Sequence, residues 1–245
     1  MNPSTRTRWH CPPKPVLAAV DFGDASARAL AIGGVLASAC DARLRALHAE
    51  RFEPPPYFTL EQIAQLEAER RMAQAAAADH LVRFTAGATP YPVQPIIVDE
   101  PPVEAILHAA ASADVIIAGT HGRRGPGRWW LGSVAERLVR AATLPVLVTR
   151  AAAGPALEVF ERLVLIGERA EPGAAARSCA ERLAGAFGGR VTEGGLVTRC
   201  QPGVMREASL VVMATDGERP SWTITDAVAR ALNACERPIL FVPAH

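Results

Sequence analysis

The sequence predicts an α/β fold in which parallel strands are covered on both faces by helices, followed by a second, shorter half of the same kind. Short aliphatic runs such as residues 114–118 alternate with Ala-rich stretches of high helix propensity. The alternation restarts after a Gly-Pro linker, where ASLVVMATDG resembles the earlier ADVIIAGTHG and RPILFVP resembles LPVLVTR. Hydrophobic residues make up 49% of the chain and aromatic ones 5%, so aliphatic and small side chains must build the core.

The first half is expected to alternate strands and helices from end to end. The predicted strands cover residues 16–20, 44–49, 93–98, 115–119 and 145–149, and the predicted helices 25–40, 59–86, 102–111 and 133–142. Two capping boxes, Thr59 with Gln62 and Ser133 with Glu136, predict the starts of two of these helices. Because parallel strands end at one edge of a sheet, Asp21, Ala49 and Gly119 should converge there.

The second half contains fewer elements. Strands are predicted at residues 163–166, 210–214 and 238–242, and helices at 172–187 and 226–235. The Gly-rich segment 188–201 supports no firm strand prediction, and a counterpart of the long helix 59–86 is missing. The expected organisation is a disordered or loosely docked leader (1–14), a first domain (15–150), a linker (151–160) and a shortened second domain (161–245).

Composition excludes several classes of partner. The chain carries 26 basic and 25 acidic residues, so no global field draws it to nucleic acid or to acidic membranes. The five cysteines lack a C-x-x-C pair, which indicates neither a disulfide framework nor a zinc ribbon and suits a reducing compartment. The histidines lack metal-ligand spacing, and no segment offers the roughly 20 apolar residues of a membrane helix. A soluble, cytoplasmic protein without a metal site is expected.

The most informative motif is Gly119-Thr-His-Gly122, followed after nine residues by Gly132-Ser133. It lies between a predicted strand and a predicted helix, where glycines allow close backbone approach and the helix amides attract anions. It is not the Walker A pattern, which requires Gly-Lys-[ST]. The alternative interpretation is structural: turn glycines at Gly119 and Gly122, and a plain helix cap at Ser133.

This motif, the strand-end residues Val20-Asp21-Phe22 and the pair His48-Ala49 together resemble the universal stress protein family over about residues 14–150. The resemblance implies two tandem adenine-nucleotide-binding α/β domains with parallel sheets, the first of which binds ATP. Magnesium could arrive with the nucleotide, although the sequence offers no dedicated carboxylate pair for it. The residues that it implies for nucleotide binding are Asp21 and the Ala49 backbone for adenine, Gly119, His121 and Gly122 for the loop, and Gly132, Ser133 and Val134 for phosphate-binding amides.

The second copy is interpreted as chemically degenerate. Ala214 stands where Gly119 stood, Thr225 and Asp226 replace the Gly-Ser pair, and Glu168 or Gly167 falls near the position of Asp21. An Asp at the start of a helix is a good cap, but its carboxylate would repel a phosphate. By resemblance to family dimers, strands 146–148 and 239–242 should pair across a pseudo-twofold axis, forming an intramolecular pseudo-dimer.

The implied function is that of a nucleotide-responsive stress or signalling regulator with an unknown protein partner and a possible homodimer. It would not be a turnover enzyme, or would hydrolyse ATP only weakly. Two alternatives stay open: an interaction or scaffold protein that does not use nucleotide, and an ATP-hydrolysing or adenylating enzyme. The basic run Arg123, Arg124 and Arg128 is either solvated charge or a phosphate contact. Trp129-Trp130 is interpreted as a hydrophobic lid or domain contact, with a membrane or protein-docking patch as the alternative.

Overall fold

The computed structural model describes residues 9–51, 60–120, 132–152, 154–167, 172–196, 202–215 and 237–243. The strands are β1 (Pro15–Ala19), β2 (Arg43–Ala49), β3 (Val93–Val98), β4 (Val115–Gly119), β5 (Val146–Thr149), β6 (Arg162–Gly167), β7 (Arg190–Leu196), β8 (Leu210–Thr215) and β9 (Ile239–Pro243). The helices are α1 (Asp24–Cys40), α2 (Leu60–Ala88), α3 (Pro102–Ala110), α4 (Ser133–Ala141), α5 (Ala174–Ala186) and α6 (Pro202–Glu207), with a 3₁₀ turn η1 (Ala156–Glu158).

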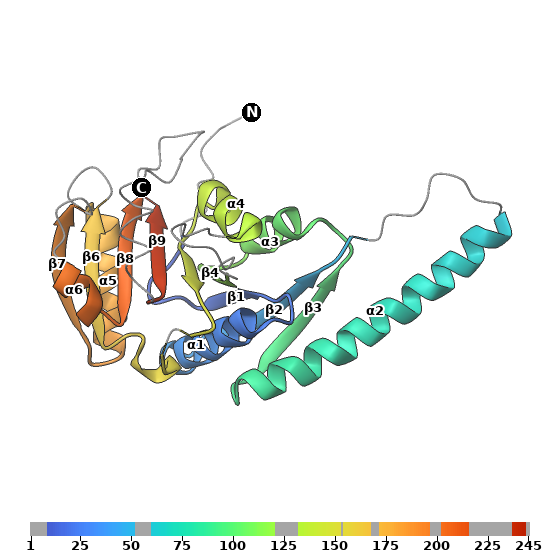
Figure 1. Cartoon of the computed structure of the whole chain (residues 1–245), viewed down its shortest axis with the longest axis horizontal. Helices are drawn as coiled ribbons and strands as arrows, with labels where there is room; N and C mark the ends of the chain where they lie inside the picture. The colour runs from blue at the N-terminus through green and yellow to red at the C-terminus, as the bar shows by residue number, and fades with distance from the viewer. Residues whose placement is uncertain are drawn as a thin grey trace.

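The described strands form one sheet of nine, in the order β3-β2-β1-β4-β5-β9-β8-β6-β7 (Figure 1). Each neighbouring pair is parallel except β5 with β9. The predicted strand and helix bounds are confirmed to within two residues wherever the elements are described. Strand β7 lies in the Gly-rich segment that supported no firm prediction, η1 and α6 were not predicted, and the predicted helix 226–235 lies outside the described residues.

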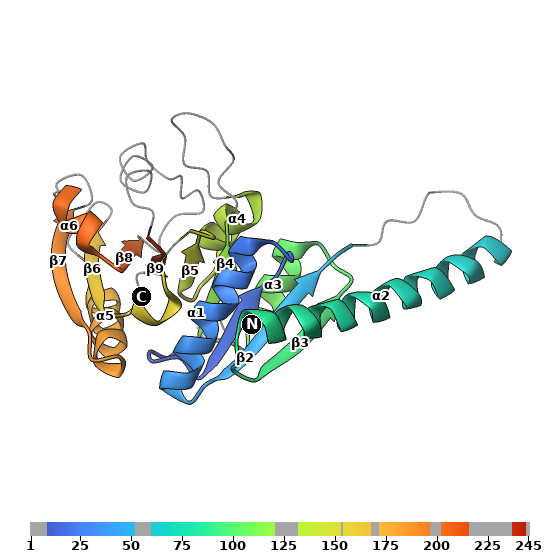
Figure 2. The same cartoon turned by 60° about the horizontal axis from the view of Figure 1, so that its bottom comes forward.

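Helices cover both faces of the sheet, as predicted (Figures 1 and 2). Alternate strand residues point to opposite faces, so Val16 joins the apolar cluster beneath α1 and α5, whereas Leu17 joins the cluster beneath α3, α4 and α6. Each cluster includes residues of both halves; Leu147 and Leu240, for example, share the first. The two halves therefore share their hydrophobic core instead of folding around separate ones.

The junction between the halves is the antiparallel pair β5–β9, with Leu147 opposite Leu240 and Val146 opposite Phe241. This confirms the predicted pairing of the two strands. All four residues of β5 are buried, because the strand is covered on both faces and paired on both edges. Without β9, the edge of β5 would expose a row of unpaired backbone groups.

The second half repeats the strand order of the first, except for its outermost strand. The order β7-β6-β8-β9 corresponds to β2-β1-β4-β5, without a counterpart of β3. Registers agree as well, since Leu163 lies opposite Leu210 as Val16 lies opposite Val115. Only residues 197–201 separate β7 from α6, too few for a strand and a long helix like α2.

Helix α2 extends well beyond the sheet (Figures 1 and 2). It is 29 residues long, and its carboxyl-terminal part packs through the fully buried Leu81 and the almost fully buried Thr85. Nearer its start, Arg70 forms an ion pair with Asp99, which follows β3. Ala, Glu, Gln and Arg give the rest of the helix its propensity. Thr59, its predicted cap, lies outside the described residues.

Residues 9–14 form a docked segment, in contrast to the expected loose leader. The buried carboxylate of Asp114, which precedes β4, accepts hydrogen bonds from the backbone amides of His10 (2.8 Å) and Lys14 (2.9 Å). Trp9 packs against both apolar clusters. The carboxylate thus joins the chain ahead of β1 to the start of β4.

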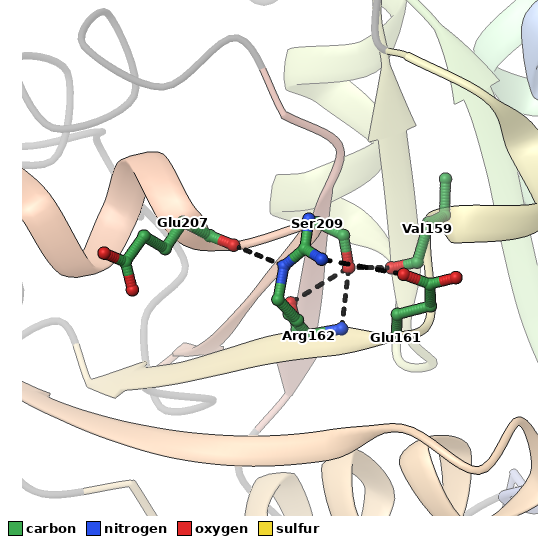
Figure 3. A network of polar contacts seen from close by, with 5 residues as sticks. All are labelled: Val159, Glu161, Arg162, Glu207 and Ser209. Atoms are coloured by element: carbon green, nitrogen blue, oxygen red, sulfur yellow. Dashed lines mark hydrogen bonds and ion pairs between the residues drawn. The ribbon is translucent and has the colours of Figure 1, made fainter.

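An equivalent connection occurs in the second half (Figure 3). Ser209, which precedes β8, accepts a 2.8 Å hydrogen bond from the amide of Arg162 at the start of β6. Its hydroxyl lies 3.0 Å from the carbonyl oxygens of Val159 and Arg162, to either of which it can donate. The Arg162 side chain donates from Nε to the carbonyl of Glu207 (2.9 Å) and lies 3.6 Å from the carboxylate of Glu161. Ser209 therefore occupies the position that Asp114 occupies in the first half.

Candidate functional site

The carboxyl ends of β1, β2 and β4 lie side by side, since Ala19 pairs with both Leu47 and Ala118. Asp21 follows β1, Ala49 ends β2 and Gly119 ends β4. The structure therefore brings these three predicted residues to one edge of the sheet. Their convergence follows from the parallel strand order, which brings the carboxyl ends of the strands to one edge. Crevices at this edge are the usual ligand sites of such sheets.

The backbone of Ala49 is turned toward β1. The carbonyl of Leu47 accepts a hydrogen bond from the amide of Val20, on the β1 side of β2. Three residues later, the amide of Glu50 donates to the carbonyl of Val98, on the β3 side. Backbone groups alternate along a strand, so those of Ala49 face the β1 side, beyond the point where β1 ends. The carbonyl of Val20, the residue after β1, is bonded to Nδ1 of His48 (2.8 Å).

Thr120 positions the start of α4 beside the end of β4. Its side chain is buried, and its Oγ1 accepts a 3.0 Å hydrogen bond from the amide of Gly132. Its own amide donates to the carbonyl of Thr149 (2.8 Å). The sequence did not single out Thr120; the available signal was a β-branched hydroxyl directly after a buried strand, at both 120 and 215.

The first turn of α4 presents backbone amides at this edge. The amide of Glu136 is the first to bond within the helix, to the carbonyl of Gly132 at 3.0 Å. The preceding amides, those of Ser133, Val134 and Ala135, have no acceptor inside the helix because of helix geometry. These amides carry the positive end of the helix dipole.

The predicted capping box at Ser133 is wrong. The N-cap residue is Gly132, with φ −52° and ψ 155° and no side-chain cap, so Ser133 is the first helical residue and is exposed. The carboxylate of Glu136 pairs with Arg140 one turn later instead of reaching back. The amide of the N-cap residue, which the carboxylate of a capping box would bind, donates to Thr120 instead.

Gly119 has a packing role that the sequence did not reveal. A Cβ built on it would lie 2.4 Å from the carbonyl carbon of Ala25 and 2.6 Å from the amide nitrogen of Ser26. The first turn of α1 therefore packs directly on the backbone of β4. This contact requires glycine whether or not a ligand approaches, so both a turn role and a ligand role become unnecessary to explain the residue.

Asp21 forms a local turn as well as standing at the proposed site. Its Oδ1 accepts a 3.0 Å hydrogen bond from the amide of Gly23, the N-cap residue of α1. Phe22 between them has φ 62°, a left-handed conformation that such Asx turns stabilise. The side chain of Asp21 is exposed, and a carboxylate has about four acceptor positions, so the turn does not exhaust its capacity to bind.

An aromatic cluster, which the sequence did not predict, lies beside Asp21. The ring of Phe22 lies 4.3 Å from those of His48 and His80, and 5.5 Å edge-to-face from that of Phe84. His48 is held by its bond to the Val20 carbonyl and is 13% exposed. The cluster joins the ends of β1 and β2 to α2, so it orders the backbone around Asp21.

An ion pair fixes α4 against α3 on the other side. Arg137 donates to Glu104 at 2.7 Å. The backbone amide of Glu104 itself and then Arg137 lower the pKa of this carboxyl. The pair is exposed to solvent and therefore contributes to position more than to stability.

Several predicted site residues lie outside the described part of the chain. They are His121, Gly122, the basic residues Arg123, Arg124 and Arg128, Trp129-Trp130, and, in the second half, Glu168, Thr225 and Asp226. In the described ranges, no group of three or more His, Cys, Asp or Glu side chains is placed to hold a metal ion, and no helix there is long and apolar enough to cross a bilayer.

The described residues form an α/β fold whose strand pairs are all parallel except β5–β9, and in folds of this class ligands usually bind at the carboxyl ends of the strands. The model of the universal stress protein family matches residues 13–150, and the chain belongs to that family. It is 36% identical over 141 residues to a universal stress protein from Thermus aquaticus, covering 56% of this chain and 98% of that one.

A Mycobacterium bovis universal stress protein is 30% identical over 140 residues, but the chain spans only 45% of its length. The crystal structure of a universal stress protein from Archaeoglobus fulgidus matches 94% of this chain and 98% of that chain, with a TM-score of 0.67 and 13% identity. A functionally unknown protein from Pseudomonas aeruginosa matches 94% of this chain and 92% of that chain, with a TM-score of 0.59. These structural matches show that the whole described fold, and not only its first half, resembles known ones.

Proposed function

We propose that the first half binds an adenine nucleotide, ATP, at the edge formed by the ends of β1, β2 and β4 and the start of α4. The observation that carries this proposal is the bond from Gly132 to Thr120, which holds the first amides of α4 beside the ends of the parallel strands. Helix amides in this position form a site for phosphate groups. Membership of the universal stress protein family supports the same assignment.

In the proposed complex, the adenine lies between Asp21 and the backbone of Ala49, whose groups face the space beyond β1. The phosphates lie against the amides of Ser133 and Val134; the amide of Gly132, the third predicted phosphate donor, donates to Thr120 instead. Gly119, His121 and Gly122 would form the rest of the loop, of which only Gly119 is described. Bound ATP would act as a charged ligand that orders this edge of the sheet.

We infer further that the second half is a shortened copy of the first that has lost this site. The repeated strand order and register support the inference, as does the equivalence of Ser209 with Asp114. Ala214 occupies the position of Gly119 in β8. The copy then serves as a built-in partner that covers the edge of β5, which makes the chain an intramolecular pseudo-dimer.

The protein would accordingly act as a nucleotide-responsive regulator and not as a turnover enzyme. The cytoplasmic location, a further protein partner and a homodimer stay predictions. If the wild-type protein shows no change in melting temperature with millimolar ATP, the scaffold alternative replaces this proposal. Phosphate release with repeated turnover would instead support the enzyme alternative.

A matched pair of substitutions at Gly132 tests the site. Its φ and ψ suit any residue, and a Cβ there would have its nearest neighbour, Oγ1 of Thr120, at an ordinary contact distance of 3.7 Å. Asp and Asn are both good N-caps, so Gly132→Asp and Gly132→Asn should leave the unliganded melting temperature unchanged or slightly raised. They differ only in the charge placed beside the proposed phosphates.

A carboxylate about 5 Å from one phosphate charge costs about 1–3 kcal/mol at an effective dielectric constant between bulk water and a protein surface. We therefore expect Gly132→Asp to bind ATP about 5- to 150-fold more weakly than Gly132→Asn, measured by titration calorimetry. Adenosine, which has no phosphate, should not distinguish the two variants. Equal ATP affinities in both variants would place the phosphates elsewhere.

A further inference from the structure

Two cysteine thiols from opposite halves of the chain lie in contact. The Sγ of Cys11, in the docked segment ahead of β1, lies 2.8 Å from the Sγ of Cys179 in α5, 168 positions away. It also lies 3.4 Å from the carbonyl oxygen of Cys179. Two sulfur atoms at this separation are closer than non-bonded sulfurs normally pack, and only a small movement separates them from covalent contact.

We propose that Cys11 and Cys179 form a reversible disulfide bond, which oxidation by a peroxide closes and which ties the segment ahead of β1 to helix α5. Such a bond joins the two halves covalently, in addition to the β5–β9 pairing. It does not depend on nucleotide binding, because neither residue belongs to the proposed site.

The surroundings of the pair hold both sulfurs in place. Asp114 fixes the backbone on either side of Cys11 through the amides of His10 and Lys14. Arg182, one turn after Cys179, donates to the carbonyl of Cys11 at 3.2 Å. The two cysteines therefore meet in the folded protein without any rearrangement of the sheet.

The two thiols differ in accessibility, which sets the order of the chemistry. Cys11 is partly exposed, whereas Cys179 is only 3% exposed. The hydrogen bond with Cys11, and then burial, raise the pKa of Cys179 well above its usual range. Since the thiolate is the reactive form, peroxide should reach and oxidise Cys11 first, and Cys179 should resolve the product.

Both steps balance. The thiolate of Cys11 attacks one peroxide oxygen, the O–O bond breaks and hydroxide leaves, giving a sulfenic acid. The sulfur of Cys179 then attacks the sulfur of Cys11, the S–S bond forms, the S–O bond breaks, and water leaves with the proton of Cys179. Overall, two thiols lose two electrons to hydrogen peroxide, which becomes two molecules of water.

Two alternatives fit the geometry less well. A soft cation bridging the two sulfurs, with metal–sulfur bonds of about 2.3 Å, would hold them farther apart than 2.8 Å. Cys40 is a second potential partner of Cys11: burial and then Cys11 raise its pKa, so it lies in the same region. Within the described residues, however, the sulfur in contact with that of Cys11 belongs to Cys179.

Peptide mapping tests the proposal directly on the full-length protein. Trypsin cleaves after Lys and Arg except before Pro, so Cys11, Cys40 and Cys179 fall in separate peptides, residues 9–28, 29–43 and 178–182. Reduced protein is treated with hydrogen peroxide, the remaining thiols are alkylated, and the digest is analysed by mass spectrometry with and without dithiothreitol.

We expect a linked pair of the peptides 9–28 and 178–182, two hydrogens lighter than their sum, which dithiothreitol separates. It should form in wild type and in Cys40→Ser but not in Cys11→Ser. Oxidation should also raise the melting temperature on the order of 5–10 °C, because the bond closes a very long loop, and this rise should be absent in Cys11→Ser. Linkage of Cys11 to Cys40, or sulfinic acid at Cys11 with Cys179 still alkylated, would overturn the proposal.

Discussion

Replacing Gly119 by Ala should strongly destabilise the fold, because the added methyl group meets backbone atoms that cannot rotate away. Its carbon would lie 2.4 Å and 2.6 Å from the carbonyl carbon and oxygen of Ala25, and 2.6 Å from the amide nitrogen of Ser26. An ordinary contact is about 1 Å longer, so the first turn of α1 must move off β4 by that amount. The surrounding core, including Ala25 and Ala118, is fully buried.

Overpacking of a dense core typically lowers the free energy of unfolding by about 1–3 kcal/mol. Because the neighbours of Gly119 are backbone atoms that cannot rotate away, we expect Gly119→Ala to cost at least the upper value of this range. A loss of about 3 kcal/mol corresponds to a fall in melting temperature of about 6–12 °C for a chain of this size. The matched control is Gly87→Ala in α2, where a Cβ would find no atom within 4 Å. There the same substitution should stabilise the helix, by less than the about 0.5–1 kcal/mol of a helix interior because Gly87 lies in the last turn.

Urea unfolding followed by far-ultraviolet circular dichroism measures both variants, with the free energy taken by linear extrapolation. The two substitutions should shift the unfolding midpoint in opposite directions. If Gly119→Ala unfolds at the same urea concentration as wild type, the packing explanation is incorrect, and Gly119 is present for the loop or the ligand alone. Measuring without nucleotide keeps the two explanations separate.

Two further substitutions test the connections that start β1 and β6. Asp114→Ala removes two hydrogen bonds to a charged acceptor and should lower the free energy of unfolding by about 3 kcal/mol. Trypsin should also cleave the N-terminal segment of this variant earlier than that of wild type. Unchanged stability and cleavage would show that other contacts hold this segment. Ser209→Ala leaves the partly buried amide of Arg162 without its acceptor and should cost about 1–3 kcal/mol in urea unfolding. The control Ser38→Ala, at an exposed position of α1, should change stability by less than about 0.5 kcal/mol. Equal effects of the two serine substitutions would contradict the assignment at Ser209.

Much of the fold could be predicted from local pattern. The β-branched run 115–118 specifies a buried strand whatever surrounds it, and the Ala-rich composition of α2 specifies a helix even where it contacts little. The convergence of Asp21, Ala49 and Gly119 also followed from sequence, because strand ends share an edge in any parallel sheet. The β5–β9 pairing was anticipated through a family resemblance and could not be obtained from either segment alone.

The details of the site could not be predicted, because they depend on contacts between distant residues. The capping box at Ser133 is wrong because the helix begins one residue earlier, with Gly132 as its N-cap, and the amide of Gly132 donates to Thr120, twelve residues before it in the chain. The residues next to Gly119 in the sequence give no indication that Ala25 packs against its backbone. The Gly-rich segment Arg190–Leu196 has only a weak strand pattern, and it forms β7 by pairing with the edge of β6.

The amino-acid sequence by itself determined the class of fold, the alternation of its elements, the repeat and the family, since these depend on hydrophobic periodicity and short motifs that act locally. The tertiary structure alone decided that the two halves share both apolar clusters, that Asp114 docks the N-terminal segment, and that Cys11 meets Cys179. These features arise from contacts across about 100 residues or more, such as the bond from Lys14 to Asp114. No local pattern encodes them, because their energy depends on which surfaces remain to be buried once the sheet has formed.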